Sequence, residues 1–232
     1  MNNIKAIFLD FDNTVVDYIK ADIESLMEVH KLLPGKLENQ EFIDISVENL
    51  LEFYKKLDKG IESPDNIHKY RLLNTLEYFN ISWEDKYLNT YGEYFLKTSY
   101  CYHGIEEFIK YFHGKVKLAI LTNSYNLDEQ KKRIENTGLA EYFDDIVVCC
   151  EIGIYKPNKE AFHHLIHKYN IEPESCIYIG DSEKYDIQGA KNAGMHAIKI
   201  IHSGVKSNES KADFLCYSFE ELKQILNTHF EI

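Results

Sequence analysis

The sequence has little of what marks several common classes of protein. Its 232 residues include only 4 prolines and 11 glycines, so long disordered segments are not expected. No basic patch or long run of Lys and Arg stands out and the formal net charge is −12, which argues against nucleic acid or an anionic membrane as partner. No apolar stretch approaches the roughly 18 residues of a membrane span, and the N-terminus does not resemble a signal peptide. We therefore expect a soluble cytoplasmic protein.

The cysteines argue against a disulfide framework. There are five, an odd number, and none of them forms a CxxC pair. Cys149 and Cys150 are adjacent, and in a strand they would point to opposite faces of the sheet. We therefore interpret the cysteines as packed or surface thiols in a reducing compartment, and neither as disulfides nor as a zinc site.

What the sequence does contain is a series of short apolar runs, each as long as a strand. Most are apolar throughout, as in parallel strands that are buried on both faces. The runs cover residues 4–9, 116–122, 145–150, 176–180, 196–201 and 213–217. Helical patterns separate several of them, at residues 104–113, 158–169 and 186–193. Strands that alternate with helices predict an α/β fold, a doubly wound parallel sheet of Rossmann-like type.

Residues 18–100 interrupt this alternation, because no buried strand is recognisable there. Four helices are predicted instead, at about 18–33, 38–58, 64–79 and 82–98. Ser63-Pro64 is a candidate start of the third helix, and Ser82 with Asp85 is a candidate capping box for the fourth. An all-helical domain is thus predicted to be inserted after the first strand of the sheet.

Polar residues follow four of the predicted strands. In open α/β sheets, ligands bind outside the carboxyl ends of the strands, so these residues are expected to meet at one edge. They are Asp10 and Asp12, Thr122 to Ser124, Lys156, and Asp181 with Asp186.

The residue types point to phosphate chemistry assisted by a metal. Clustered aspartates form the hard-oxygen site that Mg²⁺ favours, and a carboxylate can attack phosphorus. Lys156 is the one cation against four carboxylates, so the site would repel a phosphate without a divalent cation. With Mg²⁺ one negative charge remains, and none remains if crowding keeps Asp12 protonated.

Four motifs in this order resemble the haloacid dehalogenase (HAD) superfamily. They are DFDNT (10–14), LTNS (121–124), GIYKP (153–157) and GDSEKYD (180–186). The resemblance implies a HAD-like α/β core domain at 1–16 and 103–232. It also implies that residues 17–102 form the alpha-helical cap of subfamily I.

The resemblance also implies a role for each site residue. Asp10 resembles the nucleophile and Asp12 the general acid and base. Thr122 and Asn123 resemble the residues that hold the phosphoryl group, and Lys156 resembles the cation that stabilises it. The metal would be held by Asp10, the carbonyl of Asp12 and Asp181. Asp186 would bind it through water or orient Lys156.

These roles predict a Mg²⁺-dependent phosphatase that forms an aspartyl-phosphate and hydrolyses a small phosphate monoester. A phosphosugar mutase of the same superfamily keeps the whole residue set and is the alternative. A 2-haloacid dehalogenase would not need Asp12, and a phosphonate hydrolase would replace that acid with a small residue. A non-catalytic binding module would not need the intact acids and Lys156.

The substrate remains open at this point. Resemblance to small subfamily I members suggests a sugar phosphate, phosphoglycolate or a nucleotide monophosphate. The oligomeric state is open too, as monomer or dimer.

Overall fold

The computed structural model describes residues 2–59, 61, 66–202 and 209–232. The chain divides into two compact units, and each is described by itself. The α/β unit comprises Met1–Tyr18 with Ser99–Ile232, and the helical unit comprises Ile19–Thr98. That these units act as a core domain and a cap domain, with the boundaries expected above, stays a prediction.

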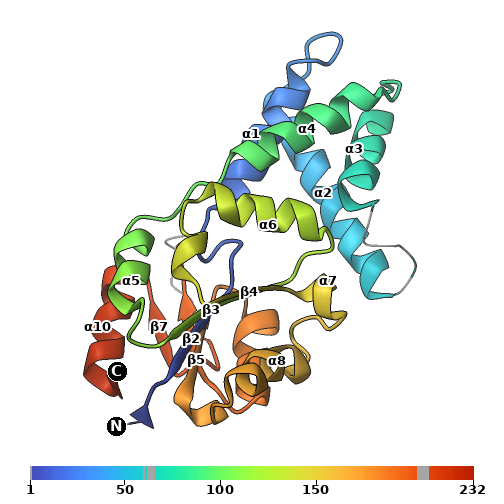
Figure 1. Ribbon diagram of the computed structural model, residues 1–232. Helices are drawn as coiled ribbons and strands as arrows, with labels where there is room; N and C mark the ends of the chain where they lie inside the picture. The colour runs from blue at the N-terminus through green and yellow to red at the C-terminus, as the bar shows by residue number, and fades with distance from the viewer. Residues whose placement is uncertain (1, 60, 62–65, 203–208) are drawn as a thin grey trace. The chain divides into compact units, whose positions relative to one another are not determined.

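A six-stranded parallel sheet forms the centre of the α/β unit (Figure 1). Its strands are β2 (Ala6–Leu9), β3 (Lys117–Thr122), β4 (Asp145–Val148), β5 (Cys176–Gly180), β6 (His196–Ile200) and β7 (Phe214–Cys216). Their order across the sheet is β4-β3-β2-β5-β6-β7, so the first of these strands in the chain is central. The predicted α/β class and parallel sheet are confirmed.

Two apolar layers enclose this sheet, because the strands carry apolar side chains toward both faces. Ile7 and Leu9 of β2 pack on one face with the helices α5 (Ile105–Phe112) and α10 (Phe219–His229). Ala6 and Phe8 of the same strand pack on the other face with α8 (Lys159–Tyr169) and α9 (Gln188–Asn192). Alternate residues of one four-residue strand therefore belong to two separate cores, which explains why the run is apolar throughout.

The helices of the α/β unit connect these strands. They are α5 (Ile105–Phe112), α6 (Leu127–Asn136), α7 (Cys149–Ile152), α8 (Lys159–Tyr169), α9 (Gln188–Asn192) and α10 (Phe219–His229). A π-helical turn, η4 (Glu183–Ile187), precedes α9, and 3₁₀ turns lie at η2 (Ala140–Tyr142) and η3 (Pro173–Ser175). Side-chain oxygens of Asn126, Asn158 and Ser218 cap α6, α8 and α10.

One expectation for this unit is wrong, and two of its helices were not predicted. Cys149 and Cys150 do not lie in a strand; they begin the short helix α7, which takes over where β4 ends. The helices α6 and α10 were not predicted. Helix α6 has a single apolar residue on its buried side, Ile134, so an apolar period of 3.6 residues is hard to recognise there. Helix α10 buries Phe219, Leu222 and Leu226 at the spacing of an amphipathic helix, so it could have been predicted from the sequence.

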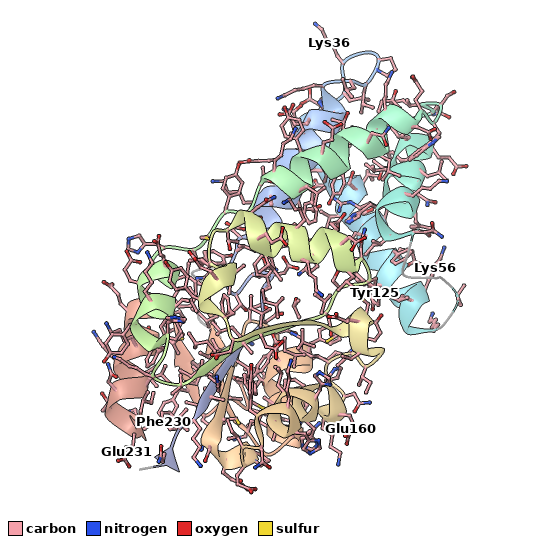
Figure 2. The ribbon with its side chains drawn as sticks, in the orientation of Figure 1. Lys36, Lys56, Tyr125, Glu160, Phe230 and Glu231 are labelled. Carbon is pink, nitrogen blue, oxygen red and sulfur yellow. The ribbon has the colours of Figure 1, made fainter. Side chains whose placement is uncertain are left out.

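A second, two-stranded parallel sheet joins the two ends of the described chain. It pairs β1 (Asn2–Asn3) with β8 (Phe230–Glu231), and Figure 2 labels both residues of β8. The five cysteines are free thiols.

The helical unit contains α1 (Tyr18–His30), α2 (Asn39–Asp58), α3 (Ile67–Tyr78) and α4 (Asp85–Lys97). The four predicted helices are therefore present, with shorter ends. The expected start at Ser63-Pro64 lies outside the described residues. The expected capping box is wrong, because Glu84 is the N-cap of α4 and no side chain caps it.

Candidate active site

The carboxyl ends of three neighbouring strands, β3, β2 and β5, lie side by side at one edge of the sheet. Asp10 follows β2, Thr122 ends β3, and Asp181 follows β5. The pairing of β2 with both neighbours is in register, and the Asp10 N–H donates to the carbonyl of Ile179 at 2.9 Å. The backbone N–H of Asp10 therefore forms the last hydrogen bond between β2 and β5, and the carboxylate of Asp10 extends from a backbone that the sheet holds in place.

Lys156 lies at the centre of the site, with its side chain only 2 % exposed. Its ammonium Nζ lies 2.8 Å from Oδ1 of Asp10 and 2.7 Å from Oδ1 of Asp186. It also donates to the hydroxyl of Tyr178 at 2.8 Å. Burial alone would lower the pKa of Lys156, but Asp10 and Asp186 together raise it well above its ordinary value. Lys156 is therefore a fixed positive charge.

Tyr178 is a site residue that the sequence analysis missed. It lies inside β5 and is fully buried, and its hydroxyl donates to the carbonyl of Leu121 at 2.7 Å while it accepts from Lys156. The only signal in the sequence is one hydroxyl within the otherwise apolar run CIYIG. Such a hydroxyl needs a buried partner, and Lys156 is that partner.

Asp10, Asp181 and Asp186 form a compact group of carboxylates. One oxygen from each lies within 4.8 Å of the others. Burial is the main cause that raises the pKa of Asp10 to about 7, with Asp186 and Asp12 adding to the rise and Lys156 opposing it. Burial, then Asp10 and Asp186, raise the pKa of Asp181 to about 8. The positive charge of Lys156 therefore does not offset the burial of these carboxylates and the repulsion between them.

Asp186 is held in place from three sides. Its Oδ1 accepts from Lys156, and its Oδ2 accepts from the Ser182 N–H at 2.9 Å. A Cβ at Gly180 would lie 2.4 Å from its Cγ, so only glycine leaves room for this side chain. Both oxygens of Asp186 are thus engaged within the protein, which agrees better with orienting Lys156 than with binding a metal directly.

Asn123 uses its side chain on the backbone of Lys156. Its amide nitrogen donates to the Lys156 carbonyl at 3.0 Å, and its amide oxygen accepts the Lys156 N–H at 2.9 Å. The rings of the neighbouring residues Tyr125 and Tyr155 lie 5.0 Å apart and join the same two loops (Figure 2 labels Tyr125). The side chain of Asn123 therefore fixes the loop that carries Lys156.

Asp12 belongs to a second cluster, formed with helix α6. Arg133 donates to Oδ1 of Asp12 at 2.7 Å from one nitrogen and to Oδ2 at 3.2 Å from another. Gln130 donates to the same Oδ2 at 3.0 Å and lies 3.3 Å from the hydroxyl of Thr122. Both α6 residues escaped the sequence analysis, because α6 itself was not predicted.

Arg133 also changes the charge balance of the site. Four carboxylates now face two cations, Lys156 and Arg133, which leaves two formal negative charges. One divalent cation would neutralise them, so a protonated Asp12 is not needed for balance. Asp10 and Asp181, two of the three clustered carboxylates, provide hard oxygen donors that suit Mg²⁺. The donor set therefore fits such an ion.

The fold and this site define an α/β enzyme core with carboxylates and a buried lysine at the strand ends. The family model of the haloacid dehalogenase-like hydrolases matches residues 4–194. The chain belongs to this family, so the predicted superfamily and the prediction of a hydrolase are confirmed.

The relatives include named phosphatases. The chain is 30% identical to the N-acylneuraminate-9-phosphatase of Rattus norvegicus over 87% of its own length and 84% of that protein. It is 32% identical to the pyrimidine 5′-nucleotidase YjjG of Escherichia coli, over 50% of this chain and 52% of the relative.

A solved structure shows the same fold. The HAD-hydrolase YfnB of Bacillus subtilis, solved bound to magnesium, has a TM-score of 0.84 with 22% identity, and the match covers 97% of this chain and 100% of that one. Across the described residues, no helix is long and apolar enough to cross a membrane.

Proposed function

We propose that this protein is a Mg²⁺-dependent phosphatase that hydrolyses a small phosphate monoester through an aspartyl-phosphate on Asp10. The observation that carries the proposal is the pairing of Asp10 with the buried Lys156 at 2.8 Å, beside Asp181 and Asp186. A carboxylate next to a fixed cation can accept a phosphoryl group, because the cation stabilises the negative charge of the phosphoryl oxygens.

In the first step, a carboxylate oxygen of Asp10 forms a bond to phosphorus while the bond from phosphorus to the leaving oxygen breaks. Asp12 gives its proton to that oxygen, which departs as an alcohol. Lys156, the hydroxyl of Thr122 and the peptide N–H of Asn123 hold the phosphoryl oxygens during the transfer.

In the second step, a water molecule attacks phosphorus and gives a proton to Asp12. The bond from phosphorus to Asp10 breaks, which restores the carboxylate and releases inorganic phosphate. Mg²⁺ held by Asp10, Asp181 and the carbonyl of Asp12 would supply positive charge for the phosphoryl oxygens throughout. Asp186 contributes by orienting Lys156, as its 2.7 Å contact supports.

The proposed substrate is a small phosphorylated metabolite. Its class follows the relatives, one of which is named for an acyl sugar acid phosphate and another for pyrimidine nucleotides. The presence of Asp12 supports hydrolysis of a phosphate ester over displacement of a halide, because a departing halide needs no proton donor.

The test is hydrolysis of p-nitrophenyl phosphate by the purified protein. Activity should disappear in EDTA and return with Mg²⁺, while Ca²⁺ should restore it poorly because its looser coordination can engage both oxygens of Asp10. Full activity in EDTA would show that the reaction does not depend on a metal.

A panel of sugar phosphates, phosphoglycolate and nucleotide monophosphates should then release inorganic phosphate from at least one member. A rearranged sugar phosphate without phosphate release would indicate a mutase instead.

A further inference from the structure

The side chain of Asp12 is oriented entirely by helix α6. In the part of the chain that the structure describes, its Oδ1 accepts one hydrogen bond, from Arg133, and its Oδ2 accepts two, from Arg133 and Gln130. The two parallel bonds from the guanidinium fix the plane of the carboxylate. Oδ2 is thus fully engaged, and Oδ1 keeps a lone pair for another partner.

Gln130 and Arg133 also hold one another. Arg133 donates to the amide oxygen of Gln130 at 2.9 Å, which turns the amide nitrogen of Gln130 toward Asp12 and Thr122. The two residues are three positions apart, so they lie on one face of α6. The first two motifs of the site are thereby connected through a single pair of side chains.

The burial of this pair is unusual for a helix that covers a sheet. Gln130 is 2 % exposed and Arg133 is 1 % exposed, whereas the side chain of Asp12 is 23 % exposed. The arginine therefore supports the acid from within the protein, and the acid is the member that solvent and ligands can reach. A pair that only stabilised the fold would gain nothing from leaving the acid accessible.

We propose that Arg133 and Gln130 are positioning residues for the proton transfers of Asp12. They hold its carboxylate so that Oδ1 faces the reacting phosphate, gives a proton to the leaving oxygen and later takes one from the attacking water. This inference rests on the proposed function, in which Asp12 is the acid and base.

Two aryl phosphates of nearly equal size separate this role from general damage. Phenyl phosphate releases a phenol whose pKa is about 10, as in tyrosine, so its departure needs a proton donor. p-Nitrophenyl phosphate releases a far less basic phenolate that departs without one. The ratio of their kcat/KM values therefore reports proton donation, and a burst of p-nitrophenolate reports slow hydrolysis of the aspartyl-phosphate.

The variant Arg133→Met should lower kcat/KM for phenyl phosphate by roughly 10²-fold and that for p-nitrophenyl phosphate by only about threefold. It should also show a burst, because Asp12 no longer activates water efficiently. Gln130→Leu should show the same pattern more weakly. Arg133→Lys should recover part of the ratio, because lysine restores the charge without the planar fork.

Lys132→Met is the matched control. Lys132 lies on the same helix, but its side chain is 59% exposed and pairs with Glu135, so both substrates should be hydrolysed at the rates of the unchanged protein. Asp12→Asn sets the largest shift in the ratio that loss of the acid can produce.

Suppose that Asp12→Asn shifts the ratio of the two kcat/KM values. The inference is then overturned if Arg133→Met and Gln130→Leu lower kcat/KM equally for both substrates and show no burst. If Asp12→Asn leaves the ratio unchanged, the role of Asp12 in the proposed function fails instead. Should Arg133→Met not fold, Gln130→Leu and Arg133→Lys decide by the same two readouts.

Discussion

Each unit of the molecule contains one buried pair of an arginine with an aspartate, and the two pairs differ in their surroundings. In the helical unit, Arg71 donates to both oxygens of Asp22 at 2.8 and 3.0 Å. Tyr91 adds a third hydrogen bond to Asp22 at 2.5 Å. The side chains are 0 % and 7 % exposed, so solvent barely reaches either partner. In the α/β unit, Arg133 is equally buried but Asp12 is 23% exposed.

The difference shows how an ion pair between arginine and aspartate can contribute either to stability or to reactivity. Asp22 and Arg71 balance one another in an enclosed place, and Tyr91 satisfies one of the acid's oxygens further. Such a pair determines which helices pack together and is costly to break. Asp12 lies beside further acids that outnumber the cations, and its charge is accessible. We therefore expect changes to the first pair to appear in stability and changes around the second to appear in activity.

The largest expected effect is on activity, from Asp10→Asn in the α/β unit. The amide cannot attack phosphorus, so kcat should fall at least roughly 10³-fold in the Mg²⁺-dependent assay. The thermal melting temperature should not fall, because one of the crowded negative charges has been removed. A variant that keeps a tenth of the activity would exclude Asp10 as the nucleophile.

The next effect is on stability, from Asp22→Asn in the helical unit. It leaves the Arg71 guanidinium buried without its carboxylate, so the free energy of unfolding in urea should fall by about 3 kcal/mol. The loss in Asp12→Asn should be smaller, about 1 kcal/mol, because that substitution also relieves repulsion from neighbouring acids.

Equal losses of stability in Asp22→Asn and Asp12→Asn would contradict the distinction between the two pairs. Tyr91→Phe is a milder control, because it removes one hydrogen bond from Asp22 and should cost about 1 kcal/mol.

The smallest effect is a pH dependence of stability in the protein stripped of metal with EDTA. Asp10 and Asp181 have pKa values of about 7 and about 8 in the folded protein, against an ordinary 3.8. The folded state therefore binds more protons than the unfolded state between about pH 4 and pH 8. Raising the pH through this window should favour unfolding.

Asp181→Asn isolates this effect, because the other carboxylates of the chain titrate in both proteins. The free energy of unfolding of the unchanged protein, minus that of the variant, should decrease steadily from about pH 4 to about pH 8. Saturating Mg²⁺ should reduce the slope, since a bound cation favours the carboxylate form. A difference that rises with pH would show that these acids are not crowded in solution.

The parts of the fold that follow an apolar pattern could be predicted from the sequence. Strands β2, β3 and β5 are largely apolar, and a polar residue ends or directly follows each of them, so their positions and the place of Asp10, Thr122 and Asp181 were recognisable. The other three strand runs and the helices of the helical unit were likewise visible, with errors of a few residues at their ends.

Two of the parts that were missed, helix α6 and Tyr178, bury polar groups. Helix α6 buries Gln130 and Arg133 where most helices bury apolar residues, so no apolar period marks it. Tyr178 resembles an ordinary core aromatic until its hydroxyl is placed against Lys156. Partners that come from distant segments, such as Asp12 with Arg133, depend on the folded chain and have no local signal.

The hydrogen bond from the Asp10 amide to Ile179 has a consequence for motion. This amide extends the pairing between two central, fully buried strands, so we expect it to open more rarely than the amides of loops and edge strands. Local unfolding in proteins usually begins at loops and edges, whereas core strands open at free energies close to that of global unfolding. The proposed nucleophile is thus anchored to a part of the sheet that opens rarely, and any adjustment to different substrates has to come from the residues around it.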